Sequence, residues 1–240
     1  MPANKSDKKK TKLHDKFYGT PLPGSVDDEL PGKLIVLEGT DGSGRSTQMS
    51  RLTRWLEVEG YGVVNTGWTQ SPLMQESIDR AKEGHTLNNT TFSLFYLADF
   101  ADRLESTIIP ALKAGFIVLA DRYIYTAYAR NVLRGLDKNW TRKIYSFAIR
   151  PDLVCYLKCD VEHLIPRMLK SKGLEYWEAG MDLALGADLY DSYCKYQPML
   201  LKEFDRMAEE FNFKVVDANR SPNEIFPDLQ KHIRKLLAEE

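Results

Sequence analysis

The segment Gly39–Ser46 combines closely spaced glycines, a basic side chain and a hydroxyl, and it reads Gly-Thr-Asp-Gly-Ser-Gly-Arg-Ser. It follows the apolar run Leu34–Leu37 and precedes a helix-like stretch from Thr47 to Glu59. In such an arrangement the glycines let consecutive backbone N–H groups turn towards an anion, and the positive end of the following helix points to the same place. The pattern therefore predicts a phosphate-binding loop, with a glycine-rich turn that binds no ligand as the alternative.

One position departs from the usual form of this loop, Gly-x4-Gly-Lys-Ser/Thr. Arg45 stands where the lysine that neutralises the outer phosphates is usual, whereas Ser46 offers the hydroxyl that binds Mg²⁺. Arginine keeps the positive charge, but its planar fork is bulkier than an ammonium group and favours bidentate contacts. We therefore expect a polyphosphate site whose basic residue differs in shape.

Asp121 and Arg122 form a second chemical pair, directly after the apolar run Phe116–Ala120. A carboxylate there can hold Mg²⁺ directly or through water, and an arginine can bind a phosphoryl oxygen. Without a phosphate loop elsewhere, the pair would be interpreted as the start of a helix with a surface arginine. Together, the two motifs favour nucleotide chemistry at one edge of a sheet.

Short apolar strands alternate with helices along the chain, which indicates an α/β fold with a five-stranded parallel sheet and helices on both faces. Ligands of such sheets bind beyond the carboxyl ends of the strands. The expected strands are 33–38, 62–66, 116–120, 153–157 and 214–216. The expected helices are 47–59, 73–83, 90–113, 123–133, 140–149, 161–170, 187–211 and 223–237.

The composition is that of an ordinary globular protein, and 240 residues suit one domain with a lid or a tail. A net charge of −1 gives no reason to expect nucleic acid or a membrane surface as a partner. The odd number of cysteines, three, favours free thiols in a reducing compartment. We find no apolar run of membrane-spanning length and no signal peptide, so we expect a cytoplasmic protein.

Residues 1–32 are expected to form a basic extension, disordered or extended, with five lysines before residue 13. The lysines are consistent with a solubilising tail or with a tail that touches phosphate-rich partners.

The sequence resembles the thymidylate kinase family of nucleoside monophosphate kinases. The matching stretches are Leu34–Gln48, Glu105–Tyr123, Pro151–Arg167 and Val215–Ala218. The resemblance implies a P-loop kinase domain over residues 33–240 with a short lid at about 171–180. It also implies transfer of the terminal phosphoryl group of ATP to a (deoxy)nucleoside monophosphate, dTMP first, with Mg²⁺ as cofactor. The family is typically homodimeric.

Functional residues follow from the resemblance position by position. Asp41 matches the carboxylate that accepts from the 3′-hydroxyl of the acceptor sugar, and Arg122 matches the arginine on the acceptor phosphate. Ser46 and Asp121 would position the metal. The expected catalytic residues are Asp41, Arg45, Asp121, Arg122 and Arg167. The expected ATP-binding residues are Gly39, Asp41, Gly42, Ser43, Gly44, Arg45, Ser46, Thr47, Asp217 and Ala218.

The acceptor side departs from the family pattern. Where Thr-Arg-Glu-Pro is usual, Thr66–Pro72 contains no arginine, and the long helix presents Tyr96 and then Phe100 instead of an aromatic residue and an arginine. Arg103 lies one turn further, where it either supplies the missing charge or pairs with a neighbouring aspartate. For Arg130 two interpretations are open: a contact with the phosphate or base of the acceptor, or a surface arginine. The expected acceptor-binding residues are Asp41, Trp68, Tyr96, Phe100, Arg103, Arg122 and Arg130.

The lid departs as well, because Tyr176 stands where the family has an arginine. Arg167, Lys170 and Lys172 remain as cations that a closing lid could bring to the transferring phosphoryl group. These losses leave two alternatives open: a nucleotide-binding regulatory protein without catalysis, and a kinase of another small acceptor such as a nucleoside.

Overall fold

The computed structural model describes residues 16–24, 29–84, 87–171 and 173–238. The lysine-rich start of the expected extension lies outside these residues. Within the extension, Phe17 is buried and forms an isolated antiparallel bridge with Ile149. Residues that precede the phosphate loop therefore contribute to the hydrophobic core.

Five parallel strands form one sheet in the order β2-β3-β1-β4-β5, which confirms the expected fold class. The strands are β1 (Lys33–Glu38), β2 (Val63–Gly67), β3 (Ile117–Asp121), β4 (Leu153–Lys158) and β5 (Lys214–Asp217). The first strand lies in the middle, so the loop that follows it opens at the centre of the carboxyl edge, beside the end of β3.

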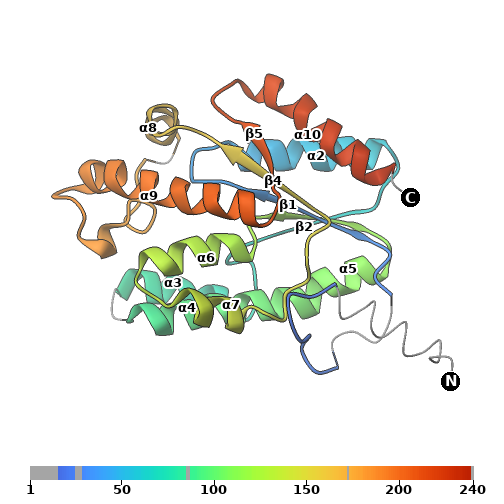
Figure 1. The fold of residues 1–240 in the computed structure, drawn as a ribbon, viewed down its shortest axis with the longest axis horizontal. Coiled ribbons are helices and arrows are strands. Elements are labelled where there is room, and N and C mark those ends of the chain that lie inside the picture. Colours follow the sequence, from blue (N-terminus) through green and yellow to red (C-terminus); the bar gives the residue numbers. More distant parts are fainter. Residues whose placement is uncertain (1–15, 25–28, 85–86, 172, 239–240) are drawn as a thin grey trace.

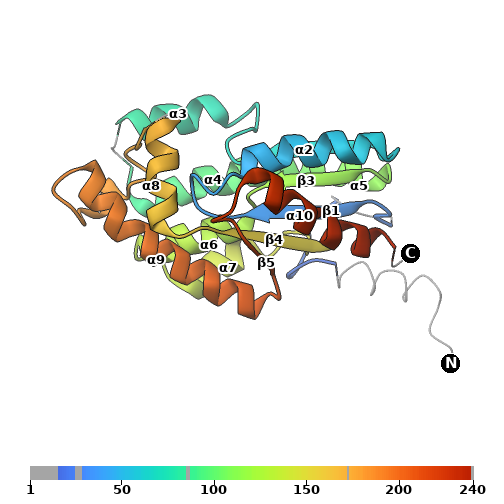
Figure 2. The ribbon, with the colours of Figure 1, turned by 90° about the horizontal axis from the view of Figure 1, so that it is seen from above.

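Helices cover both faces of the sheet (Figures 1 and 2). One face packs α2 (Arg45–Val58) and α10 (Pro222–Leu237), with α8 (Val161–Lys170) beyond the end of β4. The other face packs α4 (Asn89–Arg103), α5 (Ile109–Lys113), α6 (Ile124–Leu133), α7 (Lys138–Ile144) and α9 (Leu189–Glu210). The outlying α3 is Gln75–Gly84, and η2 (Met181–Leu183) is a single 3₁₀ turn.

Side chains of β1 alternate between the two resulting cores. Leu34 and Val36 pack towards α4–α6 and α9, whereas Ile35 and Leu37 pack towards α2 and α10. This alternation follows from the two-residue period of a strand, and burial on both faces explains why β1 reads as a continuous apolar run.

The long helix expected over 90–113 is interrupted. Residues Leu104–Ile108 form a π-helical turn between α4 and α5. Pro110 follows at the start of α5. Because proline has no N–H to donate to the preceding turn, a regular helix cannot continue through this position. The helix expected over 140–149 also ends earlier, at Ile144.

Candidate active site

The phosphate loop depends on backbone conformations that favour glycine. Gly44, at the start of α2, has φ 92°, and Gly39 has φ 149°. A Cβ on Gly39 would also lie 2.8 Å from the carbonyl oxygen of Leu157. The glycines are therefore required for the turn that directs the loop N–H groups towards an anion.

Arg45 binds the loop's own backbone. Its Nη1 donates to the carbonyl oxygens of Gly39 and Thr40, and its Nε donates to Oδ1 of Asp121 at 2.7 Å. The residue is buried. Burial alone lowers the pKa of Arg45, but the neighbouring Asp121 and Asp41 raise it above its ordinary value, so the guanidinium stays charged.

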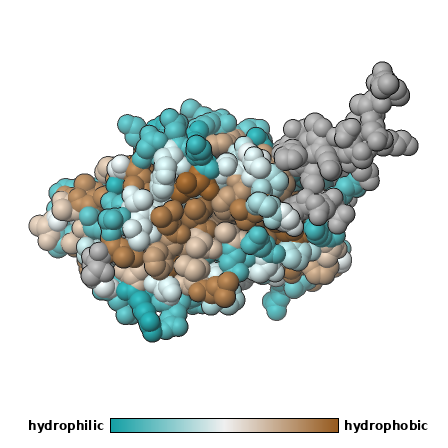
Figure 3. Space-filling view, turned by 90° about the horizontal axis from the view of Figure 1, so that it is seen from below, coloured by the Kyte–Doolittle hydropathy of each residue, from teal (hydrophilic) through white to brown (hydrophobic). Residues whose placement is uncertain are grey.

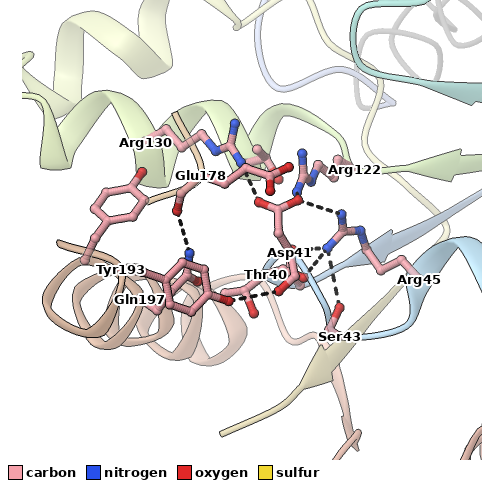
Figure 4. Close-up of polar contacts among 12 residues, drawn as sticks. Thr40, Asp41, Ser43, Arg45, Arg122, Arg130, Glu178, Tyr193 and Gln197 are labelled. Carbon is pink, nitrogen blue, oxygen red and sulfur yellow. Dashed lines mark hydrogen bonds and ion pairs between the residues drawn. The ribbon is translucent and has the colours of Figure 1, made fainter. Parts of the chain in front are cut away.

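Asp41 lies at the centre of three arginines (Figure 4). Its carboxylate accepts from Arg122 and, at 3.0 Å, from Arg130, and Nη2 of Arg45 lies 3.7 Å away. Burial by itself raises the pKa of this carboxyl, but the three guanidinium groups hold it below its usual range. With Asp121, which pairs with Arg45, the cluster holds three cations and two carboxylates, and its positive surplus can hold an anion.

Both Arg122 and Arg130 keep a buried Nε that has no hydrogen-bond partner among the described residues. Arg122 also has φ 68°, which is uncommon outside glycine, and its N–H donates to the carbonyl oxygen of Leu37 at 2.9 Å. Strained residues and unsatisfied buried donors concentrate at functional sites, so this geometry favours an anion site between the two side chains.

Glu38, at the end of β1, is a site residue that the sequence interpretation missed. It is fully buried and accepts from the N–H of Tyr123 at 2.8 Å and from the hydroxyl of Thr126 at 2.7 Å. Burial raises its pKa to about 7, despite these bonds and the nearby arginines. Glu38 thereby joins the start of the phosphate loop to the first turn of α6. The only available signal was a carboxylate at the end of an apolar strand.

A cavity of about 710 Å³ lies over the phosphate loop. Its lining includes the predicted ATP-binding residues Asp41, Gly42, Ser43, Gly44, Arg45, Ser46 and Thr47, together with Arg167. Gly39, Asp217 and Ala218 do not line it, whereas Asn219 and Arg220, which the sequence interpretation missed, do. Arg167 donates to the carbonyl oxygens of Ala218, Asn219 and Arg220, and so fixes the loop after β5.

A second cavity, of about 250 Å³, lies between α4, α6 and the lid segment. Of the predicted acceptor-binding residues, Trp68, Tyr96, Arg122 and Arg130 line it. Residues that the sequence interpretation did not assign include Phe92, Ser93, Thr126, Asn131, Arg134 and Trp177. Asp41 lines the first cavity and pairs with Arg122 and Arg130, which line the second, so this ion-paired cluster lies between the two cavities.

Phe100 and Arg103 are not brought to either cavity. Phe100 is fully buried in the aromatic core, against Tyr123 and Tyr145. Arg103 is 2% exposed. Its buried guanidinium is bound by Asp99, to which Nε donates at 2.9 Å, and by Thr66, to which Nη1 donates. In this structure both residues belong to the interior packing of α4, away from the cavity where their acceptor contacts were expected.

The predicted lid residues are not gathered at the phosphate loop. Lys170 and Tyr176 are exposed and line neither cavity, and Lys172 lies outside the described residues. Trp177 instead stacks on Phe92, with ring centroids 4.7 Å apart, and donates to the carbonyl oxygen of Lys82. The described part of the lid thus forms a wall of the smaller cavity.

Comparisons with known proteins agree with this geometry. A family profile described as thymidylate kinase matches residues 37–228. "Probable thymidylate kinase 2" of Saccharolobus solfataricus is 41% identical over 212 residues, which are 88% of this chain and 97% of that protein. "Probable thymidylate kinase" of Pyrococcus horikoshii is 33% identical over 83% of this chain and 95% of its own length. The "Thymidylate kinase" of Desulfotalea psychrophila is 37% identical over 60% of this chain and 72% of its own length. The chain, with its phosphate loop and two neighbouring cavities, belongs to the thymidylate kinase family.

Proposed function

We propose that this protein transfers the terminal phosphoryl group of ATP to the 5′-phosphate of dTMP, which gives ADP and dTDP. The observation that carries the proposal is the position of the ion-paired Asp41, Arg122 and Arg130 between the two cavities. A donor phosphate over the loop and an acceptor phosphate beside these arginines would then face each other. The names of the relatives support dTMP as the acceptor.

The donor would bind in the larger cavity, with its phosphates on the N–H groups of residues 42–47 at the positive end of α2. Arg220 and Asn219 would lie beside the nucleoside, on the loop that Arg167 holds in place. Gly39, Asp217 and Ala218 would act as backbone supports of these two loops. Arg45 would neutralise phosphate through Nη2, since its Nε and Nη1 are engaged by Asp121 and by the loop carbonyls.

Magnesium fits the residues present. Ser46 is exposed at the first turn of α2, and Asp121 keeps one carboxylate oxygen beyond the Oδ1 that Arg45 binds. Mg²⁺ commonly takes one or two protein ligands and completes its shell with phosphate oxygens and water, so it does not require a cluster of carboxylates. No group of three metal-ligating side chains is present within the described ranges. When bound, the ion would supply neutralisation of the donor phosphates.

The protein's own contribution to the reaction would be alignment and positive charge, because phosphoryl transfer needs little covalent help. Arg122 and Arg130 would bind the acceptor phosphate through the Nε groups that have no partner among the described residues. Asp41, held ionised by its arginines, would orient them and accept from the sugar 3′-hydroxyl. Tyr96 and Trp68 would flank the nucleoside. Lys170, Lys172 and Tyr176 would take part only if the lid moves towards the donor.

We further propose a homodimer through the side formed by α4, α6 and α7. Figure 3 shows a broad apolar area on the lower side of the molecule in Figure 1, where these helices lie. They carry Leu94, which is 43% exposed, and the partly buried Leu97, Leu133 and Ile144. An apolar area of this kind is typical of an interface.

A cytoplasmic location is supported by the three free cysteines. None of the helices in the described part of the chain is both long and apolar enough to cross a membrane.

The test is an acceptor panel with purified protein, ATP and Mg²⁺. The acceptors are dTMP, dUMP, dCMP, dAMP, dGMP and thymidine, and both ADP release and the phosphorylated product are measured against a control without acceptor. We expect dTMP to give the highest kcat/KM. Product from thymidine in preference to dTMP, or ATP binding without product from any acceptor, would contradict the proposal.

A further inference from the structure

Arg134 is a cation of the acceptor cavity that the function proposed above leaves without a role. It is the C-cap residue of α6, four residues after Arg130, hence about one helical turn further along the same face. It lines the cavity, and its guanidinium carbon lies 5.9 Å from the ring centroid of Trp177. Arg130 and Arg134 therefore occupy successive positions along one wall.

The guanidinium of Arg134 is fixed on one side. Its Nε and Nη2 donate to the two carboxylate oxygens of Asp182 at 2.7 and 3.0 Å, in a bidentate pair whose side chains are 6% and 10% exposed. Its Nη1 donates to the hydroxyl of Tyr196 at 3.2 Å and approaches the carbonyl oxygen of Arg130 at 3.5 Å. Within the described part of the chain, this leaves one N–H of Nη2 uncommitted, on a group whose orientation is rigid.

With the acceptor phosphate placed at Arg122 and Arg130, as proposed above, Arg134 lies about one helical turn away, towards the base. Arg122 and Arg130 mark the phosphate end, because both pair with Asp41 beside the phosphate loop. The stacked rings of Phe92 and Trp177 lie on the cavity wall near Arg134. An acceptor with its phosphate at Arg130 would direct its base along α6 towards Arg134. The 4-position of a pyrimidine is on the edge far from the sugar, so this is the atom that would meet the guanidinium.

The long helix α4 offers no competing cation. Its residues on the cavity wall are Asn89, Phe92, Ser93 and Tyr96. Phe100 and Arg103 lie in the core. Lys82 of α3 also lines the cavity, but its ammonium group lies 3.7 Å from Asp79, and its side chain is 30% exposed. Of the two described cations at this end, Arg134 is held rigidly and out of bulk solvent, whereas Lys82 is partly exposed.

We propose that Arg134 determines base specificity: its guanidinium, oriented by Asp182, donates a hydrogen bond to the 4-oxygen of the acceptor pyrimidine. This inference rests on the proposed function. It places the residue that recognises the base at the C-cap of α6, in a chain whose long helix has no arginine in the acceptor cavity. Thymine and uracil carry a 4-oxygen, which accepts the bond. Cytosine carries a 4-amino group, which would face the guanidinium donor to donor and leave both groups unsatisfied.

The test compares wild-type protein with Arg134→Met on dTMP, dUMP and dCMP. We expect kcat/KM to fall by about ten- to a hundredfold for dTMP and dUMP, because a hydrogen bond to a charged donor is lost. The value for dCMP should stay within about twofold, since that acceptor makes no such bond. The KM for ATP should not change, as Arg134 does not line the donor cavity.

Two further variants separate base reading from structural support. Arg142→Met removes another arginine with a bidentate carboxylate partner, Glu210, away from the acceptor cavity, and should leave the ratio of dTMP to dCMP unchanged. Arg134→Lys is the variant to use if Arg134→Met does not fold. It keeps a donor at this position and should retain part of the preference for dTMP over dCMP. Equal losses on all three acceptors would overturn the proposal.

Calorimetric binding of dTMP and dCMP to the wild type and to Arg134→Met gives a readout that is independent of turnover. A dTMP preference that disappears in the variant supports base reading even if no acceptor is phosphorylated, an outcome that would contradict only the proposed function. An unchanged ratio of affinities would overturn the assignment of Arg134.

Discussion

Arg45 on α2 and Asp121 at the end of β3 form an ion pair in which Nε lies 2.7 Å from Oδ1, and their side chains are 9% and 28% exposed. The pair joins the phosphate loop to the neighbouring strand. A lysine, with one nitrogen, could not hold Asp121 and the carbonyl oxygens of Gly39 and Thr40 in the same fork geometry. These contacts explain why an arginine suits this position of the loop better than a lysine.

We expect Asp121→Asn to lower kcat by at least about a hundredfold, because it removes the negative charge that would position the metal. The amide oxygen can still accept from Arg45, so the protein should stay folded. Turnover with saturating ATP and Mg²⁺, together with thermal unfolding, checks both expectations. Asp205→Asn is a matched control, because Asp205 pairs with Lys158 at the surface, and it should leave kcat unchanged. A fully active Asp121→Asn protein would remove Asp121 from the mechanism.

Arg103→Met tests whether the buried ion pair between Arg103 and Asp99 stabilises the fold. The substitution leaves Asp99 buried without its counter-ion, although Asp99 still accepts from the N–H groups of Thr69 and Ser71. We expect a loss of about 3–5 kcal/mol in the free energy of unfolding, which urea denaturation measures. Arg206→Met removes an exposed partner of Glu203 and should cost less than about 1 kcal/mol. Similar losses in the two variants would mean that the Arg103–Asp99 pair does not stabilise the fold.

The strands and the phosphate loop could be predicted because their signals are local. Each buried strand is a short apolar run, and the glycines of the loop lie within one turn of chain. The positions of Phe100 and Arg103 could not be predicted in this way. Aromatic residues occur on several faces of α4, and the face that turns inward is decided by Trp68, Tyr123 and Tyr145, which come from other segments.

Glu38 and Arg134 were missed for a related reason. The hydrogen-bond partners of Glu38 follow 85 and 88 residues later, and Asp182, the partner of Arg134, follows 48 residues later. No local pattern identifies such pairs. Asp41 was found because it lies inside the loop motif, but its three arginines come together only in the folded chain.

Glu38 predicts a pH dependence of stability. Burial raises its pKa from 4.5 to about 7 in the folded protein, against the hydrogen bonds from Thr126 and Tyr123 and the charges of Arg45 and Arg122. At a pH below the pKa of the unfolded chain, Glu38 is protonated in both states, and its contribution to the free energy of unfolding is fully present. As pH rises towards 7, the unfolded chain ionises first, so the folded state loses relative stability, by about 3 kcal/mol in all.

We therefore expect the free energy of unfolding of wild-type protein, relative to Glu38→Gln, to fall by about 2–3 kcal/mol between pH 5 and pH 8. Glutamine resembles the protonated carboxyl and does not titrate, and urea denaturation at several pH values gives the difference. Glu210→Gln is the control: its hydrogen bond from Arg142 lowers the pKa of Glu210 below 4.5, so that contribution is lost only in acid and should be flat over this range. A flat difference for Glu38→Gln as well would show that Glu38 is ionised throughout, held by Arg45 and Arg122.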